Sequence, residues 1–181
     1  ACTECFAATE LAKYLPLCVT LSPGTINFIS PDRIPDKGDV LLIGSRKSNK
    51  LISNKLIAEN EELKTDQSLH IFAFSDNGRT ITVIEGKDRV GSLYGVYAYL
   101  EQLGLRFYGL DEQGTVYPPK RTRLPQKMDI IENPSYLSRG FIGLGNRGDK
   151  NIFYWMARNR MNYCDESGKD TPFRKKLGMV L

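Results

Sequence analysis

Two glycines inside an otherwise helical stretch restrict the fold of this sequence more than any other feature. Residues 89–103 (RVGSLYGVYAYLEQL) have apolar side chains at helical spacing, and Asp88 before them is a good N-cap. Gly91 and Gly95 lie inside this helix. Each glycine costs about 1 kcal/mol relative to alanine in a helix interior, so the pair needs a structural or functional reason.

Phosphate binding and close packing are the two explanations for these glycines. A phosphate site needs its glycines in the loop before the helix, where backbone N–H groups are free. Gly91 and Gly95 lie one and two turns inside the helix, and the sequence contains no G-x-x-x-x-G-K-[ST] motif. We therefore interpret Gly91, Gly95 and Ala98 as a smooth strip that lets the helix pack closely on a sheet.

The surrounding residues predict a first domain over residues 1–125. Asn77-Gly78 between two β-rich runs is a strong hairpin signal, and Gly104 is placed to end the helix. Dense prolines from Tyr117 to Pro125, with Pro134 soon after, predict a Pro-rich linker over 126–133. The expected helices are 5–18, 49–63 and the glycine-containing helix, and the expected strands are 26–29, 39–44, 69–74, 80–85 and 105–108.

Composition excludes several classes of function. The 181 residues carry a net charge of +4, and 41% hydrophobic residues are enough for a folded core. The densest basic cluster, Lys120 to Arg123, lies in the Pro-rich stretch without the motifs of nucleic-acid binders, so we expect no nucleic-acid partner. No apolar run approaches the roughly 20 residues of a membrane span, and the sequence carries no signal peptide.

The cysteines and the single histidine give weak signals. Cys2 and Cys5 form a C-x-x-C pair, but no second pair follows and no strand precedes it, so we expect no metal and no cofactor. A disulfide involving Cys18 stays open. His70 lies in a predicted strand without a serine or cysteine nucleophile motif nearby, which favours a structural role over a catalytic one.

Residues 134–181 predict a β-loop-α-loop-β unit, with strands over 140–144 and 178–181 and a helix over 149–160. Between strand and helix, residues 143–148 read G-x-G-x-x-G, and Asp165 follows at the spacing of a ribose-binding acid. Asp149 would place a carboxylate where a pyrophosphate should lie, and the next run, residues 161–164, is short and half polar. Nucleotide binding at Gly143 to Gly148 is therefore the third hypothesis.

Several motifs together resemble a domain that precedes the catalytic barrel in family 67 α-glucuronidases, family 20 hexosaminidases and related bacterial polysaccharide-degrading proteins. The resemblance covers about residues 5–118 and implies an α+β fold, a mixed β-sheet with helices packed on one face and no catalytic residues. The motifs are Asn77–Arg79, Ile84–Asp88, Gly91–Tyr97, Leu100–Glu101 and Gly104–Tyr108, with Ala8–Leu15 and Leu41–Gly44 in the same pattern.

The resemblance further implies that residues 134–181 are the first β-α-β unit of a truncated TIM barrel. Arg139, in Ser138–Phe141, matches an Arg-Gly pair of the first barrel strand whose arginine contacts sugar. A guanidinium at the C-terminal side of a barrel could hold sugar hydroxyls or a uronate carboxylate; a surface arginine paired with a nearby acid is the alternative. The carboxylate pair of glycoside hydrolysis is expected beyond Leu181, because the spacing of Asp149, Asp165 and Glu166 marks no such pair.

These inferences lead to the expectation of a non-catalytic N-terminal domain of a periplasmic or extracellular bacterial glycoside hydrolase, inactive by itself, whose partner is a polysaccharide. The alternative is a carbohydrate-binding or scaffold module, in which Tyr154 and Trp155 stack on sugar rings. The same two side chains could equally pack against the first domain. The open strand edges of a lone β-α-β unit also predict dimerisation.

Overall fold

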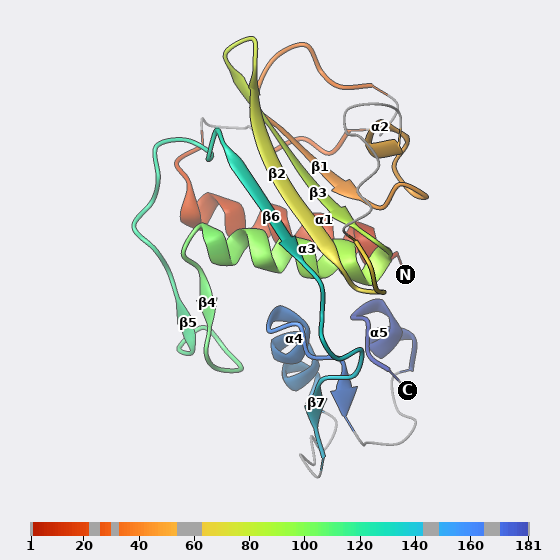
Figure 1. Cartoon of the computed structure of the whole chain (residues 1–181). Helices are drawn as coiled ribbons and strands as arrows, with labels where there is room; N and C mark the ends of the chain where they lie inside the picture. Colours follow the sequence, from red (N-terminus) through yellow and green to blue (C-terminus); the bar gives the residue numbers. More distant parts are fainter. Residues whose placement is uncertain are drawn as a thin grey trace.

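The computed structural model of the protein describes residues 2–21, 26–29, 33–53, 63–142, 149–164 and 171–180. A sheet backed by two long helices forms an N-terminal layer (residues 2–132), and a smaller C-terminal segment (residues 134–180) lies below it (Figure 1). In chain order the elements are α1 (Thr3–Cys18), β1 (Val40–Gly44), α2 (Lys50–Ser53), β2 (Leu69–Asp76), β3 (Arg79–Gly86), α3 (Arg89–Gln102), β4 (Arg106–Phe107), β5 (Thr115–Val116), β6 (Met128–Glu132), β7 (Gly140–Phe141), α4 (Lys150–Arg158), β8 (Tyr163–Cys164) and α5 (Thr171–Lys176).

The main sheet is mixed, with the strand order β1-β3-β2-β6. β1 runs parallel to β3, whereas β2 pairs antiparallel with both β3 and β6. The turn of the β2–β3 hairpin is Asn77 and Gly78, with φ values of 49° and 83°. An Asn-Gly hairpin requires positive φ at both positions, and the predicted hairpin is confirmed.

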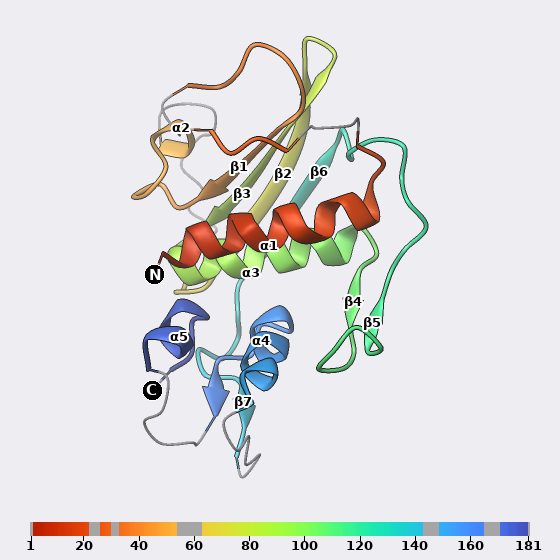
Figure 2. The same cartoon turned by 180° about the vertical axis from the view of Figure 1, so that it is seen from behind.

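The two faces of this sheet are covered differently. Helices α1 and α3 pack side by side on one face, as Figure 2 shows from behind, and bury Ile71 and Ile84. The other face, here called the outer face, carries Val83 and Leu42 against Ile52 of the short helix α2. The expected sheet with helices on one face is thus found for the two long helices, while α2 lies on the opposite side.

The glycines of α3 are explained by close packing. A Cβ atom on Gly91 would lie 2.4 Å from the backbone oxygen of Ser68, and one on Gly95 would lie 2.7 Å from Cγ2 of Ile84. The Asp88 side chain accepts a hydrogen bond from the Gly91 N–H at 2.7 Å, so Asp88 caps the helix as predicted. Only a residue without a Cβ lets α3 approach the sheet this closely, which confirms the packing interpretation.

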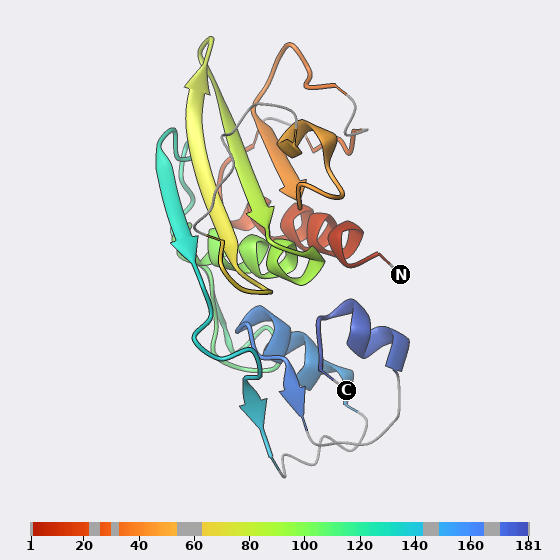
Figure 3. The same ribbon diagram turned by 45° about the vertical axis from the view of Figure 1, so that its right-hand side comes forward.

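Helix α3 is buried on all sides rather than along one stripe. Every residue from Gly91 to Leu100 is buried. The sheet covers one side of the helix and α1 another, and the C-terminal segment lies beneath both helices (Figure 3). Phe153, Met156 and Leu177 of that segment belong to the same core as α1 and α3, so the helix layer is the middle of the molecule.

The C-terminal segment contains a parallel β-α-β arrangement. β7 pairs with β8 in parallel, and Val180 forms a further parallel bridge to Tyr163. The second strand is therefore β8, in the run that the sequence analysis considered too short and polar, and Val180 adds a third position rather than the second strand. Helix α5 was not predicted. Membership of a barrel stays a proposal, because these short strands form no closed sheet.

Three other expectations differ from the structure or are only partly covered by it. Residues 26–29 form no strand. The predicted linker 126–133 contains β6, which pairs with β2. The prolines flank this run and leave residues 126–133 free of proline, so the backbone N–H groups of the run can pair at the sheet edge. Where the two domains divide stays a prediction. Of the helix expected over 49–63, α2 is observed, and residues 54–62 lie outside the described residues.

Candidate functional site

Arg139, the predicted sugar contact, lies at the junction between the N-terminal layer and the C-terminal segment. It directly precedes β7, at the strand's N-terminal end rather than at the expected C-terminal side of a barrel, and is half-buried. Its Nε donates to the backbone oxygen of Arg160 at 2.9 Å, its Nη2 donates to Oε1 of Gln67 at 2.7 Å, and its Nη1 donates to the backbone oxygen of Tyr136. The guanidinium therefore ties the start of β7 to the turn before β2.

Asn162 completes this contact and is fully buried. Its Nδ2 donates to Oε1 of Gln67 at 3.1 Å and to the backbone oxygen of Leu137 at 2.6 Å, while its Oδ1 accepts from the Arg139 N–H at 2.8 Å. Its backbone oxygen accepts from the Val180 N–H at 2.7 Å. Gln67, Arg139 and Asn162 form what we call the Gln67 cluster, which fixes the starts of β7 and β8 to the N-terminal layer.

The charge of Arg139 is not matched by an acid within this cluster. Burial lowers the pKa of Arg139, and the nearby positive charge of Arg160 lowers it further, against an opposing effect of Tyr94. Among the ion pairs between described residues, none involves Arg139. A guanidinium held by neutral oxygens keeps its charge available for an anionic group such as a carboxylate.

A second polar cluster lies deeper in the junction. Oε2 of Glu10 accepts from the Tyr97 hydroxyl at 2.9 Å and lies 3.3 Å from Nη2 of Arg158. The Arg158 guanidinium also lies over the rings of Phe107 and Tyr14, at 5.0 and 5.4 Å. The side chains of Glu10 and Arg158 are 7% and 12% exposed. We call Glu10, Tyr97 and Arg158 the Glu10 cluster.

The electrostatics of the Glu10 cluster are those of a structural ion pair. Burial opposes the positive charge of Arg158, but the Glu10 carboxylate together with Tyr14 and Tyr97 outweighs this effect, and the pKa of Arg158 is raised. Burial, and then the adjacent Glu10 charge, raises the pKa of Tyr97 well above its usual value. The tyrosine is therefore a hydrogen-bond donor at neutral pH, and the cluster joins α1, α3 and α4.

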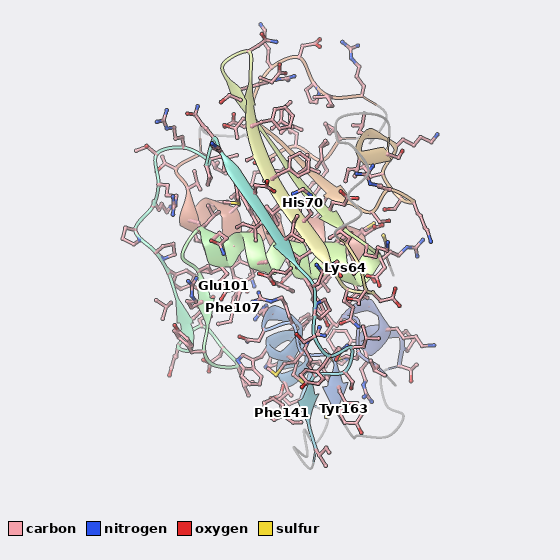
Figure 4. The ribbon with its side chains drawn as sticks, in the orientation of Figure 1. Lys64, His70, Glu101, Phe107, Phe141 and Tyr163 are labelled. Carbon is pink, nitrogen blue, oxygen red and sulfur yellow. The ribbon has the colours of Figure 1, made fainter. Side chains whose placement is uncertain are left out.

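Tyr154 and Trp155 are half-buried and pack against other aromatic side chains. Trp155 donates from Nε1 to the backbone oxygen of Phe107 at 3.1 Å and stacks on Phe141 with ring centroids 5.9 Å apart. Figure 4 labels Phe107 and Phe141, which lie on the N-terminal layer and on β7. Tyr154 packs edge-on against Phe173 at 5.1 Å. Packing against the first domain, the second of the two interpretations, accounts for the contact of Trp155 with Phe107 and for that of Tyr154 with Phe6 at 5.9 Å, while stacking on sugar rings stays a prediction.

The other predicted positions are placed as follows. Asp149 caps α4, its Oδ1 accepting from the Asn151 N–H at 2.8 Å. The G-x-G-x-x-G run 143–148, Asp165 and Glu166 lie outside the described residues. The described residues contain no group of three His, Cys, Asp or Glu side chains arranged for a metal ion. All four cysteines are free, and Cys2 Sγ accepts from the Cys5 N–H at the start of α1.

His70 reveals a region that the sequence analysis missed. It is buried on the outer face of β2, its Nε2 lies 2.7 Å from Oδ1 of Asp129, and its ring lies 4.8 Å from that of Phe72. A hollow opens beside it, lined by His70, residues 72–75 and residues 126–129. The alternation of aromatic side chains at 70, 72 and 74 was the signal in the sequence that pointed to this surface.

Comparison with solved structures supports a glycosidase-like fold. The chain is similar to a family 115 4-O-methyl-α-glucuronidase, BtGH115A, with specificity for decorated arabinogalactans: TM-score 0.67, 18% identity, 99% of this chain and 26% of that one. It is also similar to CpGH84D: TM-score 0.56, 16% identity, 92% of this chain and 26% of that one. The chain thus spans about a quarter of these glycoside hydrolases.

The searches by sequence gave no family. No protein-family model matches the chain, and no curated protein matches it. Within the described residues, no helix is both long and apolar enough to cross a membrane. At sequence identities of 16–18%, the similarity to these structures shows the fold alone. This fold is a mixed sheet with helices, as found in glycosidase domains.

Proposed function

We propose that this chain is the N-terminal accessory domain and the beginning of the catalytic barrel of a glycoside hydrolase that degrades polysaccharides, and that the chain alone is inactive. One observation carries the proposal: the similarity to the α-glucuronidase runs through 99% of this chain, and therefore through both the N-terminal layer and the C-terminal segment. The parallel pairing of β7 with β8 across α4 is the arrangement with which a (β/α)8 barrel begins.

A uronic acid is the proposed sugar of the parent enzyme. The neighbour of family 115 is a glucuronidase by its description, and this description carries the proposal of a uronic acid. Arg139 carries a charge that its contacts with neutral oxygens leave unmatched, but it lies at the N-terminal end of β7, whereas barrel active sites lie at the C-terminal ends of the strands. A uronate carboxylate would supply the missing partner. A polysaccharide substrate also agrees with a periplasmic or extracellular location, which stays a prediction.

Hydrolysis of a panel of aryl glycosides and aryl uronides tests the proposal. The 181-residue chain is compared with a form extended by the roughly 250 residues that a complete barrel needs. Cleavage by the extended form alone, with uronides preferred, supports the accessory-domain proposal. Cleavage by the short chain, or by neither form, overturns it; the second result favours the alternative of a carbohydrate-binding or scaffold module.

The role of Arg139 is separated by a second measurement on the extended form. If Arg139 contacts the sugar, Arg139→Met raises KM for uronides more than for neutral glycosides, in addition to the fall in melting temperature that follows from its lost hydrogen bonds at the junction. If it serves the junction alone, the melting temperature falls and the ratio of the two KM values is unchanged. Arg33→Met is the control, because the Arg33 side chain is 79% exposed.

A further inference from the structure

We propose that the outer face of the sheet, where β2 and β6 meet, binds an acidic polysaccharide at a site that takes no part in hydrolysis. The beginning of β6 lies at the end of the sheet away from the C-terminal segment (Figure 1). The site is therefore separate from Arg139 and from the C-terminal segment. That the bound polyanion is a polysaccharide rests on the proposed function. The binding surface itself follows from the aromatic side chains of β2 and from the basic residues beside them.

The floor of this site is a row of aromatic rings. His70, Phe72 and Phe74 alternate along β2 and therefore share the outer face. The rings of Phe72 and Phe74 are nearly parallel, at 10°, with centroids 6.2 Å apart. Both phenylalanines are half-buried and line the hollow. An apolar floor with a few polar groups around it is typical of sugar and small-molecule sites.

The hollow exists because the two strands differ in length. β6 begins at Met128, which pairs with Ala73, whereas β2 continues to Asp76. Residues 126–129 form a wall beside the last residues of β2. The Phe74 ring is thereby left at the open end of the strand, with the exposed side chains of Gln126 and Lys127 next to it.

A basic strip continues this wall. A second hollow, lined by residues 121–126, shares Gln126 with the first. Lys120, Arg121, Arg123 and Lys127 are all exposed, and residues 120–129 contain one acid, Asp129, which contacts His70. Four positive charges against one carboxylate give the surface a clear preference for anions.

The basic strip is fixed in place by backbone contacts. The Arg121 N–H donates to the Cys18 backbone oxygen at 2.9 Å, and the Arg121 backbone oxygen accepts from Thr20 at 2.8 Å. Leu124 is buried in the core formed by α1 and α3. The basic residues are thus held by the end of α1 at a constant position relative to the aromatic floor, which reduces the ordering cost of binding.

The two halves of the surface match the two halves of a uronic acid polymer. The apolar faces of pyranose rings can pack on Phe72 and Phe74, and the carboxylates can pair with Arg123 and Lys127. The sequence analysis assigned no role to the basic cluster of residues 120–123, because the aromatic residues lie about fifty positions earlier in the chain. A uronate-bearing chain would be anchored here while another part of it reaches the catalytic barrel.

Binding of polygalacturonate to the chain as given tests the inference, with a neutral dextran of equal length for comparison. The parent should bind polygalacturonate and not dextran. Arg123→Ser/Lys127→Ser should weaken binding about tenfold, as expected for two lost charge-assisted contacts. Lys37→Ser/Lys47→Ser removes the same charge from exposed positions elsewhere and should change affinity less than twofold.

The aromatic floor is tested separately. Phe74→Ala should weaken binding and Phe74→Tyr, which keeps the ring, should retain it; circular dichroism checks that both variants fold. Equal weakening by the two double variants, or stronger binding of single-stranded DNA at the same salt concentration, overturns the inference. No polygalacturonate binding at millimolar uronate also overturns it, even if the extended form is a hydrolase. If the chain binds polygalacturonate but the extended form hydrolyses no glycoside, the inference of a binding surface stands and the proposed hydrolase function is wrong.

Discussion

The Gln67 cluster and the Glu10 cluster join the same two parts of the molecule by different means. In the Glu10 cluster a buried guanidinium meets a buried carboxylate and three aromatic rings. In the Gln67 cluster the guanidinium of Arg139 meets neutral oxygens, and a buried amide supplies the remaining contacts. The pKa of Arg158 is raised and that of Arg139 is lowered. The arginine of the Glu10 cluster is therefore part of an ion pair, whereas the arginine of the Gln67 cluster has no carboxylate partner within its cluster.

Breaking the Glu10 ion pair should have the largest effect on stability. Glu10→Gln keeps an acceptor for the Tyr97 hydroxyl but leaves the Arg158 charge buried without a carboxylate. Removal of one partner of a buried pair costs about 3 kcal/mol or more. Urea denaturation should show this loss of unfolding free energy.

The ion pair between Glu101 and Arg160, which is more exposed, serves as the control for the Glu10 ion pair. Glu101 pairs with Arg160 at 2.8 Å, but its side chain is 38% exposed, so Glu101→Gln should cost no more than about 1 kcal/mol. The double variant Glu10→Gln/Arg158→Met should recover part of the loss, because it removes the unpaired charge. Equal losses for Glu10→Gln and Glu101→Gln would contradict a buried ion pair.

Removal of the amide from the Gln67 cluster should have the second largest effect. Asn162→Ala deletes two donors and one acceptor that are fully buried. Unsatisfied buried partners cost about 1–3 kcal/mol, and we expect about 2 kcal/mol in urea denaturation. Asn159→Ala is the control: its amide bonds the Phe107 and Trp155 backbone oxygens but the residue is exposed. A loss for Asn159→Ala as large as for Asn162→Ala would show that burial does not distinguish the two amides.

The elements of the N-terminal layer were predictable because their signals are local. The Asp88 cap, the Asn77-Gly78 turn and the glycines of α3 each report on a few neighbouring residues, and the structure confirms all three. Strands β6 and β8 were missed because their local signals are weak: β6 lies in a run flanked by prolines, and residues 161–164 are short and half polar. The members of the two clusters lie far apart in the sequence: Glu10 and Arg158 are 148 positions apart, and Gln67 and Asn162 are 95 apart. Of the Gln67 cluster, the sequence analysis named Arg139 alone, and the contact of Arg139 with sugar stays a prediction.

Gly91 lies where α3 packs against the turn that carries Gln67. A Cβ at position 91 would meet the backbone oxygen of Ser68 and the backbone of Gln67, whereas one at position 95 would meet the Ile84 side chain. Backbone cannot give way as a side chain can, so Gly91→Ala should destabilise by about 1 kcal/mol, an overpacking cost that exceeds the gain in helix propensity. Gly95→Ala should also destabilise, but by less, because the contact is with the buried Ile84 methyl group rather than with backbone. Thermal denaturation of the pair measures this difference, and a more stable Gly91→Ala variant would contradict the observed approach of α3 to the turn before β2.

Trp155 offers the smallest and most specific change at the junction. Trp155→Phe removes the Nε1 donor to the Phe107 backbone oxygen and retains an aromatic ring against Phe141. That oxygen still accepts from Nδ2 of Asn159 at 3.0 Å, so it is not left unsatisfied, and the loss should be about 0.5 kcal/mol. In the background of Asn159→Ala the same change should cost more, because no donor then remains. A double-mutant cycle by urea denaturation measures this coupling. Strict additivity would mean that solvent, rather than either side chain, satisfies the oxygen, and that this edge of the junction is open.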